Sequence, residues 1–259
     1  MRYCLLFEYD GEKYHGWQVQ PDTVTVQQII TKCLSDILKQ NISLVGAGRT
    51  DTGVHAKFMT AHFDCNCEIE TEEIKQKLNN YLPEEISIFK VVKVKKNFHA
   101  RFDAVSRTYK YYINQQKMPF EQRSFFYKKE IDLALMNKAC EMIIGKKDFT
   151  SFSKVHTQNH TNICEIYRAE WNYERQMICF TIQANRFLRN MVRAIVGTML
   201  LVGEKKISPD EINNIIKKKN RGFAGVSVPA KGLFLVNIKY HEKDLLAWKR
   251  LEILLIGYY

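Results

Sequence analysis

The chain has 259 residues, of which 46% are hydrophobic and 12% aromatic, so it can build a substantial core and is neither a disordered tail nor a collagen-like repeat. Its 39 Lys and Arg residues outnumber its 28 Asp and Glu residues, giving a formal net charge of +11. Such an excess suits either a polyanionic partner or plain solubility, and it does not separate RNA from DNA or an acidic membrane.

The first half of the chain alternates strand and helix patterns. Residues 2–9 predict a strand, and residues 10–13 predict a turn. Residues 24–39 carry apolar side chains at the i, i+3, i+4 spacing of an amphipathic helix, with Thr25 as its N-cap. The other elements expected in this half are strands at 42–47, 57–64 and 86–95 and a helix at 71–82.

The second half repeats this alternation loosely. A strongly apolar helix is expected from about Phe187 to Val202. The other expected elements are strands at 105–114, 164–173, 177–184 and 232–240 and helices at 131–144 and 209–218. Since hairpins are expected as well, we predict an α+β fold with largely antiparallel sheets flanked by helices. We divide it into an N-terminal subdomain, 1–104, and a C-terminal subdomain, 105–259.

Cysteine usage and the chain ends bear on the compartment. The seven cysteines are odd in number and scattered, and the opening MRYCLLFEYD lacks the basic and apolar segments of a signal peptide. Residues 245–259 are apolar but too short and too charged to span a bilayer. We therefore expect reduced thiols in a cytoplasmic protein without a membrane partner.

The richest stretch is the glycine-rich loop at residues 46–56 (GAGRTDTGVHA), which joins two expected strands. Glycines permit close approach of the backbone to a ligand, and loops held by rigid elements frequently carry function. The loop matches neither GxGxxG nor GxxxxGK[ST], so a nucleotide phosphate loop is not expected. Taken alone, Asp51 is either a turn residue that accepts hydrogen bonds from backbone amides or a functional carboxylate.

A longer pattern around Asp51 carries a family resemblance. The string G-R-T-D-x-G-V-H-A has eight specified residues in nine positions and resembles the catalytic loop of the tRNA pseudouridine synthase A family. Further matching stretches, in the family's order, are residues 9–20 (YDGEKYHGWQVQ), 98–111 (FHARFDAVSRTYKY), 185–197 (NRFLRNMVRAIVG) and 229–235 (PAKGLFL). The resemblance therefore spans about residues 3 to 240.

The resemblance implies an isomerase that detaches uracil from its ribose, rotates it and rejoins it through C5. Its substrate would be the anticodon stem-loop of tRNA, at positions 38, 39 and 40. It implies the pseudouridine synthase fold, in which two similar α/β halves surround a central active-site cleft. Nothing is supplied from outside, so it implies no cofactor, nucleotide or metal. It also implies a homodimer, because tRNA spans both subunits.

By resemblance, Asp51 is the catalytic carboxylate and Arg193 its basic partner. A guanidinium close by favours the charged form of a carboxylate and can bind it in bidentate fashion. Arg193 lies within the apolar helical stretch, where a charge needs a partner, so we expect an internal salt bridge. The alternative is an arginine that extends to solvent. Whether Asp51 attacks the base, attacks the sugar or mainly removes a proton stays open.

The resemblance gives two more residues direct roles. Tyr109 would stack on the target base and help to move the C5 proton, although a strand tyrosine is also a common packing residue. Arg49 would help to extrude the target nucleotide from the stem, or else it is a surface arginine. Gln18 and Trp17 are expected to support the loop, and Leu235 to form part of the apolar wall around the base. We expect His55 to be a core histidine.

Clustered lysines and possible metal ligands both have simpler explanations. Runs such as Lys217–Lys219 are either solvated faces or contacts to tRNA phosphates. The pair Cys65 and Cys67 lacks a second pair at zinc-finger spacing, and the group His156, His160 and Cys164 lies in an expected loop. We therefore expect no structural metal.

Two other functions stay open beside a tRNA enzyme. One is a pseudouridine synthase that acts on another RNA, which the sequence barely separates from the first. The other is a non-catalytic RNA-binding or chaperone protein of the same fold. Loss of Asp51, Tyr109 or Arg193 would favour it, and all three are present.

Overall fold

The computed structural model describes residues 1–154 and 161–241, and these residues form two compact units. Of these described residues, unit 1 comprises Met1–Thr50, Ala56–Val105 and 237–241, and unit 2 comprises Asp51–His55, 106–154 and 161–236. Each unit combines strands and helices, so the α+β class is confirmed. The subdomain boundary after residue 104 stays a prediction. No helix in the described part is long and apolar enough to cross a membrane.

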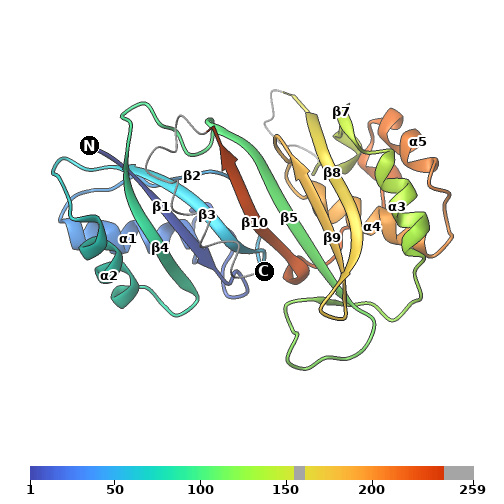
Figure 1. Ribbon diagram of the computed structural model, residues 1–259, viewed down its shortest axis with the longest axis horizontal. Helices are drawn as coiled ribbons and strands as arrows, with labels where there is room; N and C mark the ends of the chain where they lie inside the picture. The colour runs from blue at the N-terminus through green and yellow to red at the C-terminus, as the bar shows by residue number, and fades with distance from the viewer. Residues whose placement is uncertain (155–160, 242–259) are drawn as a thin grey trace. The chain divides into compact units, whose positions relative to one another are not determined.

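Unit 1 is an antiparallel sheet with two helices (Figure 1). The strand order in this unit is β4-β1-β3-β10, where β10 (Leu233–Tyr240) belongs to unit 1 from Asn237 onward, and β2 pairs with β3. Tyr3–Phe7 on the central strand are all buried. Helix α2 packs against β4 and α1. The elements are β1 (Arg2–Tyr9), α1 (Val26–Leu38), β2 (Val45–Gly46), β3 (His55–Asp64), α2 (Thr71–Tyr81) and β4 (Ile86–Val94).

Unit 2 has the strand order β10-β5-β9-β8-β7, with β6 beside β5. Helix α3 packs against β8 and α4, and Figure 1 shows α3, α4 and α5 gathered beside β8. The elements are β5 (Ala104–Asn114), β6 (Phe125–Phe126), α3 (Leu133–Glu141), β7 (Gly145–Asp148), β8 (Ile163–Glu174), β9 (Met177–Ala184), α4 (Met191–Gly203), α5 (Glu211–Lys218) and β10 (Leu233–Tyr240). Single-turn 3-10 helices lie at Thr150–Phe152, Arg221–Phe223 and Ala230–Gly232.

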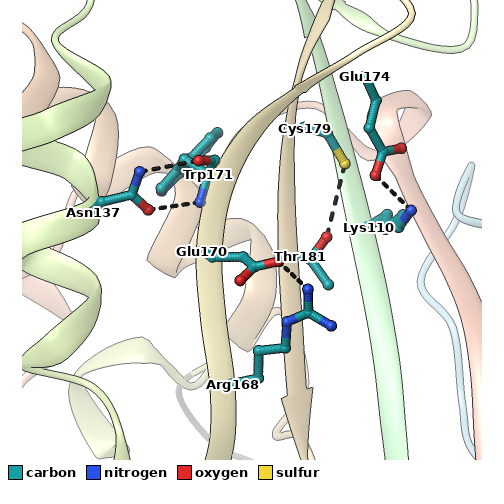
Figure 2. Close-up of polar contacts among 8 residues, drawn as sticks. All are labelled: Lys110, Asn137, Arg168, Glu170, Trp171, Glu174, Cys179 and Thr181. Atoms are coloured by element: carbon teal, nitrogen blue, oxygen red, sulfur yellow. Dashed lines mark hydrogen bonds and ion pairs between the residues drawn. The ribbon is translucent and has the colours of Figure 1, made fainter.

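Polar contacts fix the register of helix and strands in unit 2 (Figure 2). The Asn137 amide of α3 donates to the Trp171 carbonyl at 3.0 Å and accepts from the Trp171 N–H at 2.8 Å, so α3 is tied to β8. Lys110 of β5 pairs with Glu174 at 2.7 Å. Since Tyr109 stands opposite Ile182 and Lys110 opposite Thr181, the two neighbours point to opposite faces of the sheet.

Several predicted elements differ in extent from those observed. The apolar helix begins at Met191 rather than Phe187, because Asn190 adopts a left-handed φ of 67° that the helix cannot include. The strand expected at 42–47 shrinks to Val45–Gly46, since the Ile42 N–H and the Leu44 carbonyl bond to side chains of α1 instead. Strand β7 was not predicted, because its two lysines hide any apolar alternation. The N-cap predicted at Thr25 is confirmed.

Two histidines in unit 1 hold the loop at residues 98–103 by accepting backbone hydrogen bonds. His62 Nδ1 accepts from the Ala100 N–H at 3.1 Å. His99 Nδ1 accepts from the N–H groups of Arg101 and Phe102, each at 3.2 Å. Tyr240 donates to the Ala100 carbonyl at 2.6 Å. An accepting ring nitrogen must be unprotonated, so this loop depends on neutral histidines.

This network makes stability depend on pH. Burial, and to a smaller extent the charge of Arg2, lowers the pKa of His62 to about 4. The unfolded chain then binds the proton more readily than the folded chain between about pH 6.5 and 4, so stability is lost as pH falls through this range. From pH 7 to pH 5 the expected contribution to this loss is about 2 kcal/mol.

A His62→Asn variant separates this contribution from other titrations. Asparagine keeps an acceptor near the position of Nδ1 but does not titrate, so we expect its unfolding free energy to fall less steeply with acid than that of the wild-type chain. Urea denaturation at pH 7 and pH 5 measures the difference in slope. Equal slopes for the two proteins would show that His62 does not titrate on unfolding.

Candidate active site

The loop before Asp51 is fixed in unit 1 by close packing around Trp17. A Cβ at Gly46 would lie 2.6 Å from the Trp17 ring, so only glycine fits there. The backbone N–H of Trp17 donates to the Thr50 carbonyl at 3.2 Å, and the Thr50 and Tyr9 hydroxyls are 2.8 Å apart. The residue immediately before Asp51 is thus held by both backbone and side chain. The support expected from Trp17 is observed.

The Asp51 carboxylate in unit 2 faces two guanidinium groups. Its Oδ1 lies 3.6 Å from Arg189 Nε and its Oδ2 lies 3.7 Å from Arg193 Nη1. The side chains of Asp51 and Arg193 are 24% and 21% exposed, whereas that of Arg189 is 59% exposed. The Asp51–Arg193 pair is therefore the more shielded of the two, and water screens Arg189 more strongly.

Arg193 is held in place by residues 225–228, a segment that crosses α4 and is called the crossing segment. Its Nε donates to the Val228 carbonyl at 2.7 Å, and the Val228 N–H donates back to the Arg193 carbonyl at 3.3 Å. A Cβ at Gly197 would lie 1.8 Å from the Val226 carbonyl oxygen. The missing side chain at Gly197 therefore lets the crossing segment lie against α4 and orient Arg193. Arg193 does not simply extend to solvent.

Tyr109 is buried in β5 and interacts electrostatically with Asp51. Burial raises its pKa to about 12, with Asp51 adding to the rise and Arg107 opposing it. Its ring meets that of Phe187 edge to face, with centroids 5.2 Å apart. The hydroxyl is therefore protonated at neutral pH and can donate a hydrogen bond, while the ring offers an aromatic surface.

The other residues singled out from the sequence lie as follows. Leu235 is buried in β10 in unit 2. His55 is buried there too, with Nε2 3.2 Å from the Lys231 carbonyl and its ring stacked on Phe234, as a core histidine would be. Arg49 and Gln18 belong to unit 1, and both side chains are exposed. The structure thus brings Asp51, Tyr109 and Arg193 together within unit 2.

Arg189 is the residue that sequence reasoning missed. It stands at an unspecified position of the matching stretch, in a part that we expected to be helical. The left-handed turn at Asn190 ends the preceding loop, and the Arg189 carbonyl accepts from the Lys154 N–H at 3.1 Å. The only sequence signal was that Arg189 and Arg193 are four residues apart, which would place them on one face of a continuous helix. That spacing is as typical of an exposed helix surface as of a functional site.

The cysteine pair considered as a metal site has two sulfur atoms and one amide. Cys65 Sγ and Cys67 Sγ are 3.3 Å apart, and the Gln40 amide nitrogen lies 3.3 Å from Cys67 Sγ. Within residues 1–154 and 161–241, no three His, Cys, Asp or Glu side chains gather in a way that could hold a metal. His156 and His160 lie outside the described residues.

Comparison with known proteins places these residues in a family. A family model described as tRNA pseudouridine synthase matches residues 5–103 and 139–241. A tRNA pseudouridine synthase A of Bacteroides fragilis is 49% identical over 246 residues, covering 93% of this chain and 97% of the relative. Another from Azobacteroides pseudotrichonymphae is 49% identical over 240 residues, with coverage of 92% and 96%. One from a Thermoanaerobacter species is 38% identical over 239 residues, with coverage of 91% and 98%.

An α+β chain with these matches is a pseudouridine synthase, an isomerase that acts on uridine in RNA. Within that class, the chain belongs to the tRNA pseudouridine synthase family. Its substrate is therefore tRNA, and the resemblance found in the sequence is confirmed.

The two arginines should differ in importance. Arg193→Ala removes the more shielded partner of Asp51 together with the bond to Val228, and we expect isomerisation to slow by at least about 100-fold, as when one fixed donor is removed from an active site. Arg189→Ala removes an exposed, screened charge, and we expect a loss of less than about tenfold. Single-turnover rates on tRNA measure both. A larger loss for Arg189→Ala would show that the order is wrong.

Proposed function

We propose that the chain converts uridine to pseudouridine at positions 38, 39 and 40 in the anticodon stem-loop of tRNA. The observation that supports an active enzyme is the Asp51 carboxylate between Arg189 and Arg193, with the buried Tyr109 in electrostatic interaction with Asp51. The relatives named tRNA pseudouridine synthase A match over nearly their whole length, which supports the same substrate class. The choice of positions rests on the family resemblance.

The reaction is an isomerisation, so its atoms balance within the nucleotide. The bond between N1 and C1′ breaks, and a bond between C5 and C1′ forms. A proton leaves C5, and N1 gains one. Asp51 supplies the anionic oxygen that the reaction needs, and Arg193 balances that charge while no substrate is bound. Tyr109 stacks on the base, and its protonated hydroxyl is available to donate during proton transfer.

Three further residues supply polar and apolar groups for binding the nucleotide. Arg49 and Gln18 supply exposed polar groups from unit 1, where a cation can hold the backbone of an extruded nucleotide. Leu235 supplies an apolar side chain from β10. We propose these three as substrate-binding residues, beside the catalytic residues Asp51, Tyr109 and Arg193.

The enzyme acts as a cytoplasmic homodimer in this proposal. The seven cysteines are all free thiols, which suits a reducing compartment. The dimer is inferred from the family, in which tRNA spans both subunits. The apolar C-terminal residues 245–259 are a candidate for the dimer interface, and they lie outside the described residues. A solution mass of one chain, measured by light scattering with and without tRNA, would contradict the dimer.

Pseudouridine profiling of RNA from a strain that lacks this gene tests the substrate. We expect pseudouridine to disappear from positions 38, 39 and 40 of tRNAs that carry uridine there and to persist elsewhere. A plasmid copy of the wild-type gene should restore it. Loss at another position or in another RNA, with positions 38 to 40 unchanged, would contradict the proposed substrate.

A further inference from the structure

Unit 1 displays an aromatic ring that the chemistry at Asp51 does not use. Phe102 is 75% exposed, although the rest of its loop is tightly held. The His99 ring contacts it with centroids 4.2 Å apart, and the Arg101 guanidinium lies 5.7 Å from its centroid. Phe102 therefore extends from a position where a backbone turn and a neighbouring ring fix its direction.

The loop under Phe102 is built to stay rigid. The N–H groups of Ala100, Arg101 and Phe102 all bond to histidine nitrogens, as described above. The His99 N–H donates to Asp103 Oδ2 at 2.7 Å, and the Asp103 N–H donates to the His99 carbonyl at 3.0 Å. A ring held by such a loop loses little freedom when a ligand binds, which favours binding.

A cavity of about 390 Å³ opens beside this ring, at the lower end of the range for sites that hold small ligands. The cavity is lined by aromatic, cationic and polar groups of unit 1. The lining residues are Lys95, Asn97, Phe98, Phe102, Asp103, Ala104, Val105 and His241. Asp103 is the acidic member, and one of its oxygens is already turned into the loop by the His99 N–H.

We propose that Phe102 and this cavity bind an unpaired base of the tRNA substrate, apart from the uridine that reacts. An exposed aromatic ring beside Lys95 and Arg101 has the chemistry by which proteins stack single-stranded bases while cations contact the backbone. The net charge of +11 favours a polyanion such as RNA over a neutral or basic protein segment. The inference rests on tRNA being the substrate but not on which positions are modified.

The ring itself can be tested by substitution. Loss of one stacked base through Phe102→Ala should raise the Kd for an unmodified tRNA transcript by about 5- to 100-fold. Phe102→Trp should restore binding to within about threefold, because it keeps a flat aromatic surface. The rate at saturating tRNA should stay unchanged, since Asp51 and its partners are intact. Filter binding and single-turnover rates measure the two effects.

Tyr81→Ala is the matched control. It removes another aromatic side chain, 67% exposed in the same unit, from the end of α2 and outside the cavity lining. We expect its Kd to equal that of the wild-type chain. The proposal would be overturned if Phe102→Ala bound the tRNA transcript as tightly as the wild-type chain does. It would also be overturned if both alanine variants lost tRNA affinity equally.

Photocrosslinking gives a readout that needs no variant. After irradiation of the wild-type complex and digestion by nuclease and trypsin, a nucleotide adduct is expected on the peptide of residues 102–107. Adducts confined to other peptides would overturn the proposal even if Phe102→Ala failed to fold. Failure of the wild-type chain to bind any tRNA would instead count against the proposed function itself.

Discussion

Asp51→Asn is expected to slow pseudouridine formation by at least about 1,000-fold, because the amide keeps the size of the side chain but removes its anionic oxygen. A neutral amide can neither act as the nucleophile nor remove a proton at neutral pH. Release of tritium from tRNA that contains [5-³H]uridine follows the loss of the C5 proton and measures the rate. Affinity for tRNA should fall by much less than the rate.

Asp22→Asn is the control for this change. Asp22 is exposed and has a left-handed φ of 55°, a conformation that asparagine adopts readily. We expect it to release tritium at the wild-type rate. An Asp51→Asn enzyme that retains more than a tenth of wild-type activity would remove Asp51 from the chemistry, whatever its position in the structure.

Gly197→Ala is expected to destabilise the chain by about 3 kcal/mol or more. Alanine is intrinsically better than glycine inside a helix by about 1 kcal/mol, so propensity alone predicts the opposite sign. The new Cβ would lie 1.8 Å from the Val226 carbonyl oxygen and 2.9 Å from the Val226 carbonyl carbon. Because the obstacle is backbone rather than a flexible side chain, the crossing segment must move.

Thermal unfolding measures this effect. A loss of this size corresponds to a fall of roughly 6–12 °C in Tm for a protein of this size. Gly48→Ala serves as the matched control, since a Cβ at Gly48 meets nothing within 4 Å. We expect Gly48→Ala to unfold within about 0.5 kcal/mol of the wild-type chain. A Gly197→Ala variant as stable as wild type would show that the helix and the crossing segment separate freely.

The same substitution links packing to function. The crossing segment that packs against Gly197 also contains Val228, whose carbonyl accepts the hydrogen bond from Arg193 Nε. In addition, the Gly225 N–H of that segment donates to Thr198 Oγ1 on α4 at 2.9 Å. If the segment moves, Arg193 loses the bond that orients it toward Asp51. A Gly197→Ala protein that still folds at low temperature should therefore isomerise uridine more slowly than wild type.

The sequence singled out the loop and an arginine in need of a partner, and the family resemblance implied that this arginine pairs with Asp51. The glycines and polar residues of 46–56 have a local signature, and a charge inside an apolar helix demands a neighbour of opposite sign. The long strands β1, β3 and β5 and the helix α1 were predictable for a similar reason, because short apolar runs and the i, i+4 pattern are local.

What the sequence did not yield depends on tertiary contacts. Arg189 approaches Asp51 because a left-handed residue follows it, and no pattern marks that turn. The acceptor role of His62 arises because a strand meets a loop that is distant from it in the chain. The closeness of Gly197 to Val226 likewise follows from a crossing of two segments rather than from either segment.

The measurement that tests the account most directly is pseudouridine mapping on unmodified tRNA transcripts. Wild-type and Asp51→Asn chains are each incubated in excess over tRNA, with no metal or nucleotide added. We predict conversion at positions 38 to 40 by the wild-type chain and none by the variant, although both bind the transcript. Equal conversion by the two chains would contradict the assignment of Asp51, and tight binding with no conversion by either would contradict an active tRNA isomerase.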